Sequence, residues 1–291
     1  MEIKPQHTRQ AEHPGTMAEI LGFDAFSPQE IAARIENVGV VKARLPLLST
    51  AMLGLLAGAF IGLGALYYVL VVSDSQLGFA ASRVLGGLCF SLGLLLVVVA
   101  GAELFTGNNL LAMAWADGRI TTWEVLRNWI VVCAANGIGA VGLAFIVFLA
   151  DHSSMNGGAV ARTYLEIAVT KTQMPFWTAF WRGVLCNVLV CMAVWMSFAG
   201  RSVVDKLVAV VFPISAFVAA GFEHSIANMY FIPLAMLLKA SGIELPPGGE
   251  TIGLAGLTGN LVPVIAGNLV GGSVLVALVY YVIYRRPKGH P

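Results

Sequence analysis

The chain has 291 residues, of which 58% are hydrophobic and 11% are charged, and its formal net charge is +1. Soluble domains carry about 25% charged residues, so the composition excludes an ordinary soluble protein, and the near-neutral charge gives no reason to expect a nucleic-acid partner. The apolar residues occur in runs of about 18 or more, the length of a membrane-spanning helix. We therefore predict an all-α integral membrane protein.

Residues 1–44 are predicted to form an N-terminal arm, because they are polar and carry no pattern typical of a signal peptide. Within the stretch SPQEIAARIENVG, Ser27 is a candidate N-cap, Pro28 takes the first helical position and Glu30 completes a capping box. This short amphipathic helix is too polar to span a membrane. We expect it to lie against the bilayer or against the cytoplasmic mouth of the protein.

Residues 45–285 hold six apolar segments and are predicted to be a six-helix transmembrane domain, followed by a short cytoplasmic tail over 286–291. Lys and Arg near the segment ends are more frequent on the side of the N-terminus, so both termini are expected in the cytoplasm. The segments are expected near 46–72, 84–115, 128–150, 176–199, 207–239 and 258–284.

The second and fifth segments are each interrupted near the middle by a similar polar stretch, GAELFTGN over 101–108 and GFEHSIAN over 221–228. Both fit the pattern G-x-E-x-x-x-x-N, and the span after each one contains N-x-x-G, beginning at Asn136 and Asn268. The two halves therefore indicate an inverted repeat, with the second and fifth helices broken. Unwound backbone is tolerated where it lines a cavity or is buried in protein, and its free N–H groups suit an anion.

Three ionisable residues, Glu103, Glu223 and His224, lie inside these interrupted segments, where a charge is costly. We expect each glutamate to support a helix break by accepting hydrogen bonds from free backbone N–H groups. Asparagines in the spans are expected to bridge the broken backbone or to tie the repeats together. They are Asn108, Asn136, Asn187, Asn228 and Asn268.

His224 is the only histidine inside a predicted span, and imidazole can gain or lose a proton under ordinary conditions. An apolar pore favours its neutral form unless an anion arrives to pair with it. We expect a small anion to meet two neutral donors, Thr106 and His224, and either to take a proton from the imidazole or to be held by it. Lys171 is placed in the outer loop at the edge of the fourth segment, where it either attracts anions or is simply solvated.

At these stretches the chain resembles the formate/nitrite transporter family. The resemblance is carried by GAELFTGN (101–108), LCNVLVCMAVWM (185–196), GFEHSIANMY (221–230) and NLVPVIAGNLVGG (260–272), and it extends from about Ala43 to Tyr284. It implies an aquaporin-like six-helix protomer in the inner (plasma) membrane, assembled as a homopentamer in which each subunit has its own pore. The N-terminal helix resembles the formate-channel arm that covers the cytoplasmic mouth and responds to pH.

The resemblance also implies roles for individual residues. His224 corresponds to the family's central protonatable histidine, and Thr106 corresponds to the threonine that faces it. Asn187 corresponds to the asparagine hydrogen-bonded near the pore, and Lys171 to the lysine of the outer vestibule. Apolar constrictions of the pore are implied at Phe90, Leu94, Leu104, Val190, Phe217 and Phe222.

The expected function is a pH-sensitive channel or proton-coupled transporter for formate and related small monovalent anions, with protons exchanged at His224. A nitrite or hydrosulfide channel of the same family is the alternative, because the second break reads ELFTGN where enteric formate channels have DLFTS.

Other classes fit less well. A water channel would need an Asn-Pro-Ala pair, which this chain lacks, and an ammonium channel would need two facing histidines. An enzyme is not expected, because Ser225 directly follows His224 and adjacent helical residues point in different directions. Neither a cofactor nor a metal is expected, since the four cysteines match no metal or redox spacing.

Overall fold

The computed structural model describes residues 25–74 and 76–286, so residues 1–24 of the predicted arm and 287–291 of the predicted tail lie outside it. Among the described residues, six helices are long and apolar enough to cross a membrane. The predicted all-α membrane fold with six spans is therefore confirmed.

The elements fall into two similar series. Those of the first half are α2 (Pro28–Ala43), α3 (Leu47–Val72), α4 (Phe79–Phe90), α5 (Leu92–Ala100), η1 (Gly107–Leu110), α6 (Leu111–Ala116) and α7 (Thr122–Leu149). Those of the second half are η2 (His152–Ser154), η3 (Asn156–Gly158), α8 (Ala159–Thr172), α9 (Phe176–Ser197), α10 (Val203–Ala220), α11 (Ser225–Ala240), η4 (Gly249–Thr251), α12 (Leu254–Leu269), the π-helical η5 (Val270–Leu278) and α13 (Val279–Tyr284).

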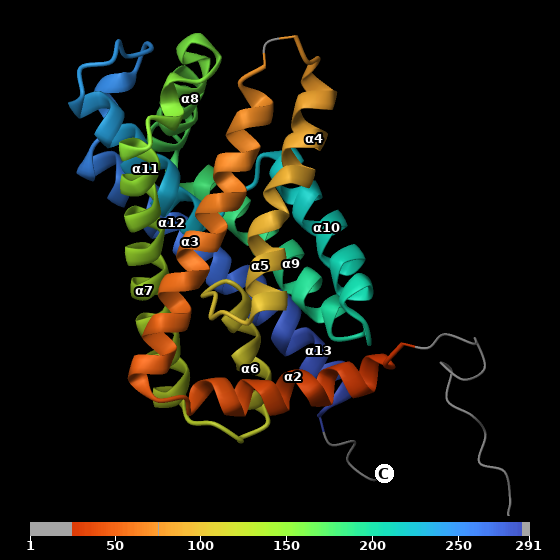
Figure 1. The fold of residues 1–291 in the computed structure, drawn as a ribbon. Helices are drawn as coiled ribbons and strands as arrows, with labels where there is room; N and C mark the ends of the chain where they lie inside the picture. The colour runs from red at the N-terminus through yellow and green to blue at the C-terminus, as the bar shows by residue number, and fades with distance from the viewer. Residues whose placement is uncertain (1–24, 75, 287–291) are drawn as a thin grey trace, which may run out of the picture.

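The amphipathic helix α2 lies across one end of the bundle, and α8 lies at the opposite end (Figure 1). The Ser27 side chain accepts the Glu30 N–H and the Glu30 carboxylate accepts the Ser27 N–H, which is the capping box that the sequence predicts. The apolar face of α2, including Ile31 and Ile35, is buried against residues of α6, α9 and η5. Burial of this face places α2 against the ends of the spans.

Both interrupted spans end their first helix at a glycine with a left-handed backbone, Gly101 with φ of 80° and Gly221 with φ of 74°. A positive φ is costly for residues that carry a Cβ, so glycine suits these helix ends. The chain is not helical over 102–106 and again over 222–224 before helix resumes. The polar stretches of the sequence therefore lie in short irregular segments inside the bundle.

The repeat extends beyond the spans and includes the amphipathic helices. The helices α2 and α8 hold equivalent places, because each ends near a lysine that is followed four residues later by the proline that precedes the next span. These pairs are Lys42 with Pro46 and Lys171 with Pro175. Each half of the chain therefore contributes an amphipathic helix, a full span, a broken span and a second full span.

Candidate functional site

The two broken spans meet where Thr106 and His224 lie side by side. Thr106 Oγ1 is 3.2 Å from His224 Nε2, and both side chains are buried. The other ring nitrogen, Nδ1, accepts a hydrogen bond of 3.2 Å from the Ala227 N–H at the start of α11. The neutral ring therefore carries its proton on Nε2 and donates it to Thr106. The threonine hydroxyl proton is left to donate to another acceptor.

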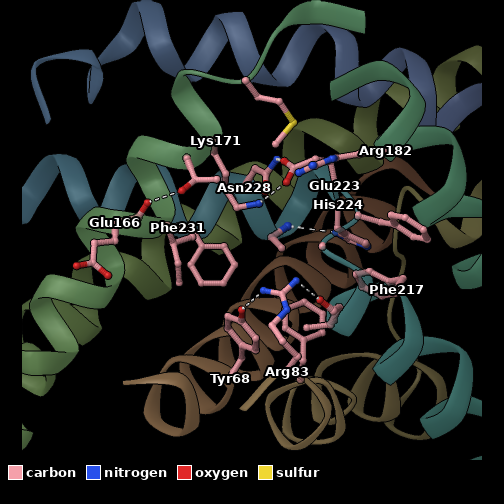
Figure 2. A pocket seen from close by; sticks show the side chains of 18 of the residues that line it. Tyr68, Arg83, Glu166, Lys171, Arg182, Phe217, Glu223, His224, Asn228 and Phe231 are labelled. Atoms are coloured by element: carbon pink, nitrogen blue, oxygen red, sulfur yellow. Dashed lines mark hydrogen bonds and ion pairs between the residues drawn. The ribbon is translucent and has the colours of Figure 1, made fainter. Parts of the chain in front are cut away.

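Two cavities approach this pair from opposite ends of the bundle. The α8-side cavity, of about 280 Å³, includes Lys171 and reaches His224 (Figure 2). The α2-side cavity, of about 380 Å³, includes Lys42 and Glu103. Charged side chains thus line both approaches to a pair of neutral hydrogen-bonding groups.

Most of the side chains predicted to constrict a pore line one of the two cavities. Phe90, Phe217 and Phe222 line the α8-side cavity, and Leu94 and Leu104 line the α2-side cavity. Val190 is buried and lines neither. The Phe217 ring stacks on the His224 ring with 5.8 Å between centroids. The polar pair is therefore buried next to an aromatic side chain, and further apolar side chains line both cavities.

On the α8 side, Glu223 is the centre of a buried network. Its Oε1 is 2.9 Å from Lys171 Nζ, and its Oε2 accepts from Asn228 Nδ2 at 2.7 Å. Lys171 lies on the helix α8 and is ion-paired, so the expectation of a solvated loop lysine is wrong, whereas its attraction for anions stays a prediction. Its charge is compensated by Glu223.

On the α2 side, Glu103 repeats this arrangement. Its Oε1 is 3.0 Å from Lys42 Nζ, and its Oε2 accepts from Asn108 Nδ2 at 2.6 Å. Lys42 Nζ also donates to Asn108 Oδ1 at 2.9 Å. Because Lys42 is on α2, docking of the amphipathic helix supplies the cation of this network.

The predicted partners of the two glutamates are corrected by these contacts. In the described part of the chain, the carboxylates of Glu103 and Glu223 accept from lysine and asparagine side chains and not from backbone N–H groups. The reason is that each carboxylate lies next to a lysine from the amphipathic helix, and a charged donor forms a stronger hydrogen bond than a neutral amide.

Asn136 and Asn268 satisfy the irregular backbone. Asn136 Oδ1 accepts the Phe105 N–H at 2.9 Å, and its Nδ2 donates to the carbonyls of Gly54 and Glu103 at 2.7 and 2.8 Å. Asn268 makes the matching set, accepting from the Ser225 N–H and donating to the carbonyls of Gly183 and Glu223. Each asparagine therefore ties a broken span to a full span on either side.

Asn128 and Asn260, which no sequence pattern had singled out, complete the two networks. Asn128 Oδ1 accepts from Asn108 Nδ2 at 2.9 Å, and Asn260 Oδ1 accepts from Asn228 Nδ2 at 2.7 Å. Their own amides donate to the carbonyls of Lys42 and Lys171, respectively. The sequence could have indicated them, because each of the two asparagines lies eight residues before the asparagine of an N-x-x-G motif.

Asn187 is buried beside the pair without a hydrogen bond to His224. Its Nδ2 donates to Asn109 Oδ1 and to the Asn268 carbonyl, both at 2.7 Å, and more weakly to the Thr106 carbonyl at 3.3 Å. It therefore links the segment that carries Thr106 to the last span. Among the described residues, no group of three or more His, Cys, Asp or Glu side chains is arranged to hold a metal ion.

The helix α2 is anchored by a buried carboxylate. Glu36 is fully buried, and its Oε2 is 2.7 Å from Arg285 Nε, just beyond α13, and 3.9 Å from Arg119 Nη1. Its Oε1 has no hydrogen-bond partner. Burial raises the pKa of the Glu36 carboxyl, although the Arg285 guanidinium acts in the opposite direction.

Comparisons with known proteins agree along almost the whole chain. A family model described as formate/nitrite transporter matches residues 29–282. The formate channel FocA of Escherichia coli K12 is 38% identical over 280 residues, covering 92% of this chain and 98% of that protein. A probable formate transporter of Methanothermobacter thermautotrophicus is 34% identical and covers 91% of this chain and all of its own length.

Solved structures of similar chains have the same fold. A pentameric formate channel with formate bound matches with a TM-score of 0.75 and 36% identity, covering 82% of this chain and 97% of that one. A structure described as an FNT family ion channel matches with a TM-score of 0.72 and 28% identity, covering 88% of this chain and 98% of that one. These relatives are channels and transporters and not enzymes.

Proposed function

Because the chain belongs to the formate/nitrite transporter family, we propose that this multi-pass membrane protein conducts formate and related small monovalent anions. One observation carries the proposal. The Thr106–His224 pair is buried among apolar side chains between two cavities lined by charged residues, and the α8-side lining holds three cations against two carboxylates. The net positive charge of that lining favours an anion, whereas the apolar surroundings of the pair oppose the passage of a charge. A channel for small anions must therefore lower the energetic cost of moving the anion past these apolar side chains.

His224 is the group at which the permeant anion exchanges its charge for a proton. The anion first accepts a hydrogen bond from the Thr106 hydroxyl, which the neutral His224 ring leaves available. The ring takes a proton from a hydronium ion, so one O–H bond breaks, one N–H bond forms and a water molecule is left. The imidazolium then gives a proton to the anion, so one N–H bond breaks and one O–H bond forms on the anion. The ring is neutral again, and the neutral acid passes the apolar side chains. Another hydronium ion supplies the next proton to the ring.

The Ala227 N–H disfavours the charged form of the His224 ring in the absence of an anion. An imidazolium carries protons on both nitrogens, so its Nδ1–H would face the Ala227 N–H and the hydrogen bond between them would be lost. An adjacent anion offsets this cost through its charge. Protonation and anion entry are therefore coupled, which is the basis of the proposed pH sensitivity.

Flux measurements test this function and its alternative, a nitrite or hydrosulfide channel. Proteoliposomes containing the full chain are supplied with formate, nitrite or hydrosulfide, each with and without an inward proton gradient. We expect formate uptake that the gradient increases, because protonation neutralises the anion. Faster uptake of nitrite or hydrosulfide would favour the alternative, and the absence of flux for all three would refute both.

The relatives of this chain and its distribution of Lys and Arg support an assembly and an orientation in the membrane. We propose a homopentamer with a pore in each subunit, supported by the pentameric formate channel that this chain resembles. We also propose an inner-membrane location with the α2 end in the cytoplasm, supported by the greater number of Lys and Arg at that end of the spans. The α8-side cavity then opens to the outside.

The docked α2 is proposed to narrow the cytoplasmic mouth. Ile35, Val38 and Gly39 of α2 line the α2-side cavity together with Lys42. Release of the helix would widen this cavity and would also take Lys42 away from Glu103, leaving a carboxylate without its cation. Docking therefore controls both the width and the charge of the mouth.

Glu36 is expected to make this docking depend on pH. Since burial raises the pKa of Glu36 in the docked helix, the docked state binds a proton more tightly than the released state. The extra docking strength is complete below the ordinary carboxyl value of 4.5 and is lost as the pH rises through the raised pKa. Hydrogen exchange of α2 amides in the wild type should therefore show more protection at about pH 5 than at about pH 7.5, after correction for the intrinsic rate.

Glu36→Gln should remove this difference, because glutamine cannot titrate. The control is Glu166→Gln, which changes an exposed carboxylate on α8 at the other end of the bundle and should leave the protection of α2 as pH-dependent as in the wild type. A Glu36→Gln protein that keeps the wild-type pH dependence would show that another group controls docking.

A further inference from the structure

The α8-side cavity contains more charge than the proposed passage of an anion uses. Five charged side chains line it, namely Arg83, Glu166, Lys171, Arg182 and Glu223. The attraction that an arriving anion experiences depends on which of these charges are already neutralised within the protein.

Lys171 and Glu223 neutralise one another. Their charged atoms are 2.9 Å apart, and the side chains are only 12% and 4% exposed. Opposite charges this close present little net field to an ion at the mouth of the cavity. This pair is therefore not the main source of attraction, although Lys171 is the lysine that the sequence singles out.

Arg83 keeps its charge while being held in place. Its Nε and Nη2 donate to the carbonyls of Ala219 and Val218 at 2.9 and 3.0 Å, and its Nη1 donates to the Tyr68 hydroxyl at 3.2 Å. All three acceptors are uncharged, so they orient the guanidinium at the end of α10 without neutralising it. Figure 2 shows this group in the wall of the pocket.

Arg182 is a second uncompensated cation, and it lies beside the helix break. Its carbonyl accepts the Glu223 N–H at 3.2 Å, and its exposed side chain lines the cavity. Within the described ranges, no ion pair involves its guanidinium. The remaining carboxylate of the lining, Glu166, points away from Arg182 in Figure 2.

The repeat shows that the helix break does not require this arginine. On the α2 side, the Glu103 N–H donates to the Leu53 carbonyl at 3.2 Å, just as the Glu223 N–H donates to Arg182. Leucine therefore performs the same backbone role at the equivalent place. The positive charge of Arg182 serves the α8-side cavity and not the fold.

We propose that Arg182, supported by the charge of Arg83, forms a capture site for a small planar oxyanion at the α8-side cavity, ahead of His224. A guanidinium presents two parallel N–H donors, which match the two oxygens of a carboxylate. This site rests on the proposed function, because it supplies the anion that the Thr106–His224 pair then receives. Lys171 acts in the network of Glu223 and not as the receiving cation.

The test measures initial rates of formate uptake against formate concentration in proteoliposomes of the wild type, Arg182→Leu and Arg182→Lys. Arg182→Leu should raise KM about fivefold with little change in the maximal rate, since a single charge in a water-filled cavity contributes on that order. High salt should shrink the difference by screening. Arg182→Lys should give an intermediate KM, because it keeps the charge and loses the paired donors.

Arg162→Leu is the matched control. Arg162 is an exposed arginine on the same end of the molecule, but it does not line the α8-side cavity. It lines a neighbouring surface pocket with Asp151 and Glu244, and this pocket shares only Glu166 with that cavity. Its loss should leave KM unchanged. A wild-type KM in Arg182→Leu, an equal shift in Arg162→Leu, or a lower maximal rate at constant KM would each overturn the capture site.

If vesicles containing the wild type transport no formate, the proposed function is wrong, but the capture site is still testable. In that case equilibrium binding of formate to the solubilised wild type and to Arg182→Leu decides the capture site. Weaker binding to the variant supports it, and equal affinities overturn it.

Discussion

Replacing His224 by asparagine is expected to leave a folded channel in which a proton gradient no longer increases formate uptake. Asparagine still offers an oxygen to the Ala227 N–H, so the start of α11 keeps its cap. It has no group that titrates, and therefore cannot give a proton to an anion beside Thr106. Loss of one charge-assisted hydrogen bond corresponds to roughly 1.5–3 kcal/mol, which is about a 10- to 100-fold reduction of gradient-driven uptake.

The measurement compares formate uptake with and without an inward proton gradient, after size-exclusion chromatography has established that the variant assembles as the wild type does. His152→Asn is the control, because His152 lies in the short η2 outside the six spans and should leave the coupling unchanged. Gradient-driven uptake at the wild-type rate in His224→Asn would refute the protonation role of this ring.

Replacing Gly139 by valine is expected to prevent folding of the membrane domain. A Cβ at this position would lie 1.9 Å from the Leu55 carbonyl oxygen and 3.1 Å from the Leu55 Cα. Backbone atoms of α3 cannot move aside as the end of a side chain can, so α3 and α7 must separate. Overpacking of a core costs about 1–3 kcal/mol when side chains yield, and we expect more than about 3 kcal/mol here.

Separation of α3 and α7 would also pull Asn136 from the Gly54 carbonyl and so release the irregular segment that carries Thr106. Gly142→Val is the matched control on the same helix, because a Cβ there meets no atom within 4 Å. The yield of monodisperse protein and its thermal unfolding measure the effect. Equal yields and unfolding temperatures for the two variants would contradict a close crossing at Gly139.

The N-x-x-G motifs illustrate what a pattern in the sequence can predict. The repeated motif indicated equivalent spans, and the structure explains both the asparagine and the glycine of the pattern. The asparagines Asn136 and Asn268 bind the irregular backbone, and Gly271 repeats the close approach of Gly139, since a Cβ there would lie 2.2 Å from the Val184 carbonyl oxygen. Repeated motifs of this kind can be predicted from the sequence because each half of the chain forms the same local structure.

The partners of the charged residues could not be predicted from the sequence in the same way. Glu103 and Glu223 were recognised as support for the breaks, but their lysine partners come from amphipathic helices 61 and 52 residues earlier in the chain, a pairing that appears only when the helices pack. Arg182 was counted in the sequence only as one of the charges near the ends of the spans, because its place in the cavity is seen only in the structure.

The sequence by itself determined the class of the protein, its six spans, the two breaks and the residues His224 and Thr106 at their centre. These features follow from hydrophobic length and from an internal repeat, which are properties of consecutive residues. The tertiary structure alone decided which charges are neutralised: Lys171 by Glu223, Lys42 by Glu103 and Glu36 by Arg285, with Arg182 left open to the cavity. The physical reason is that electrostatic energy depends on distance in space and on burial, and neither is encoded in the spacing of residues along the chain.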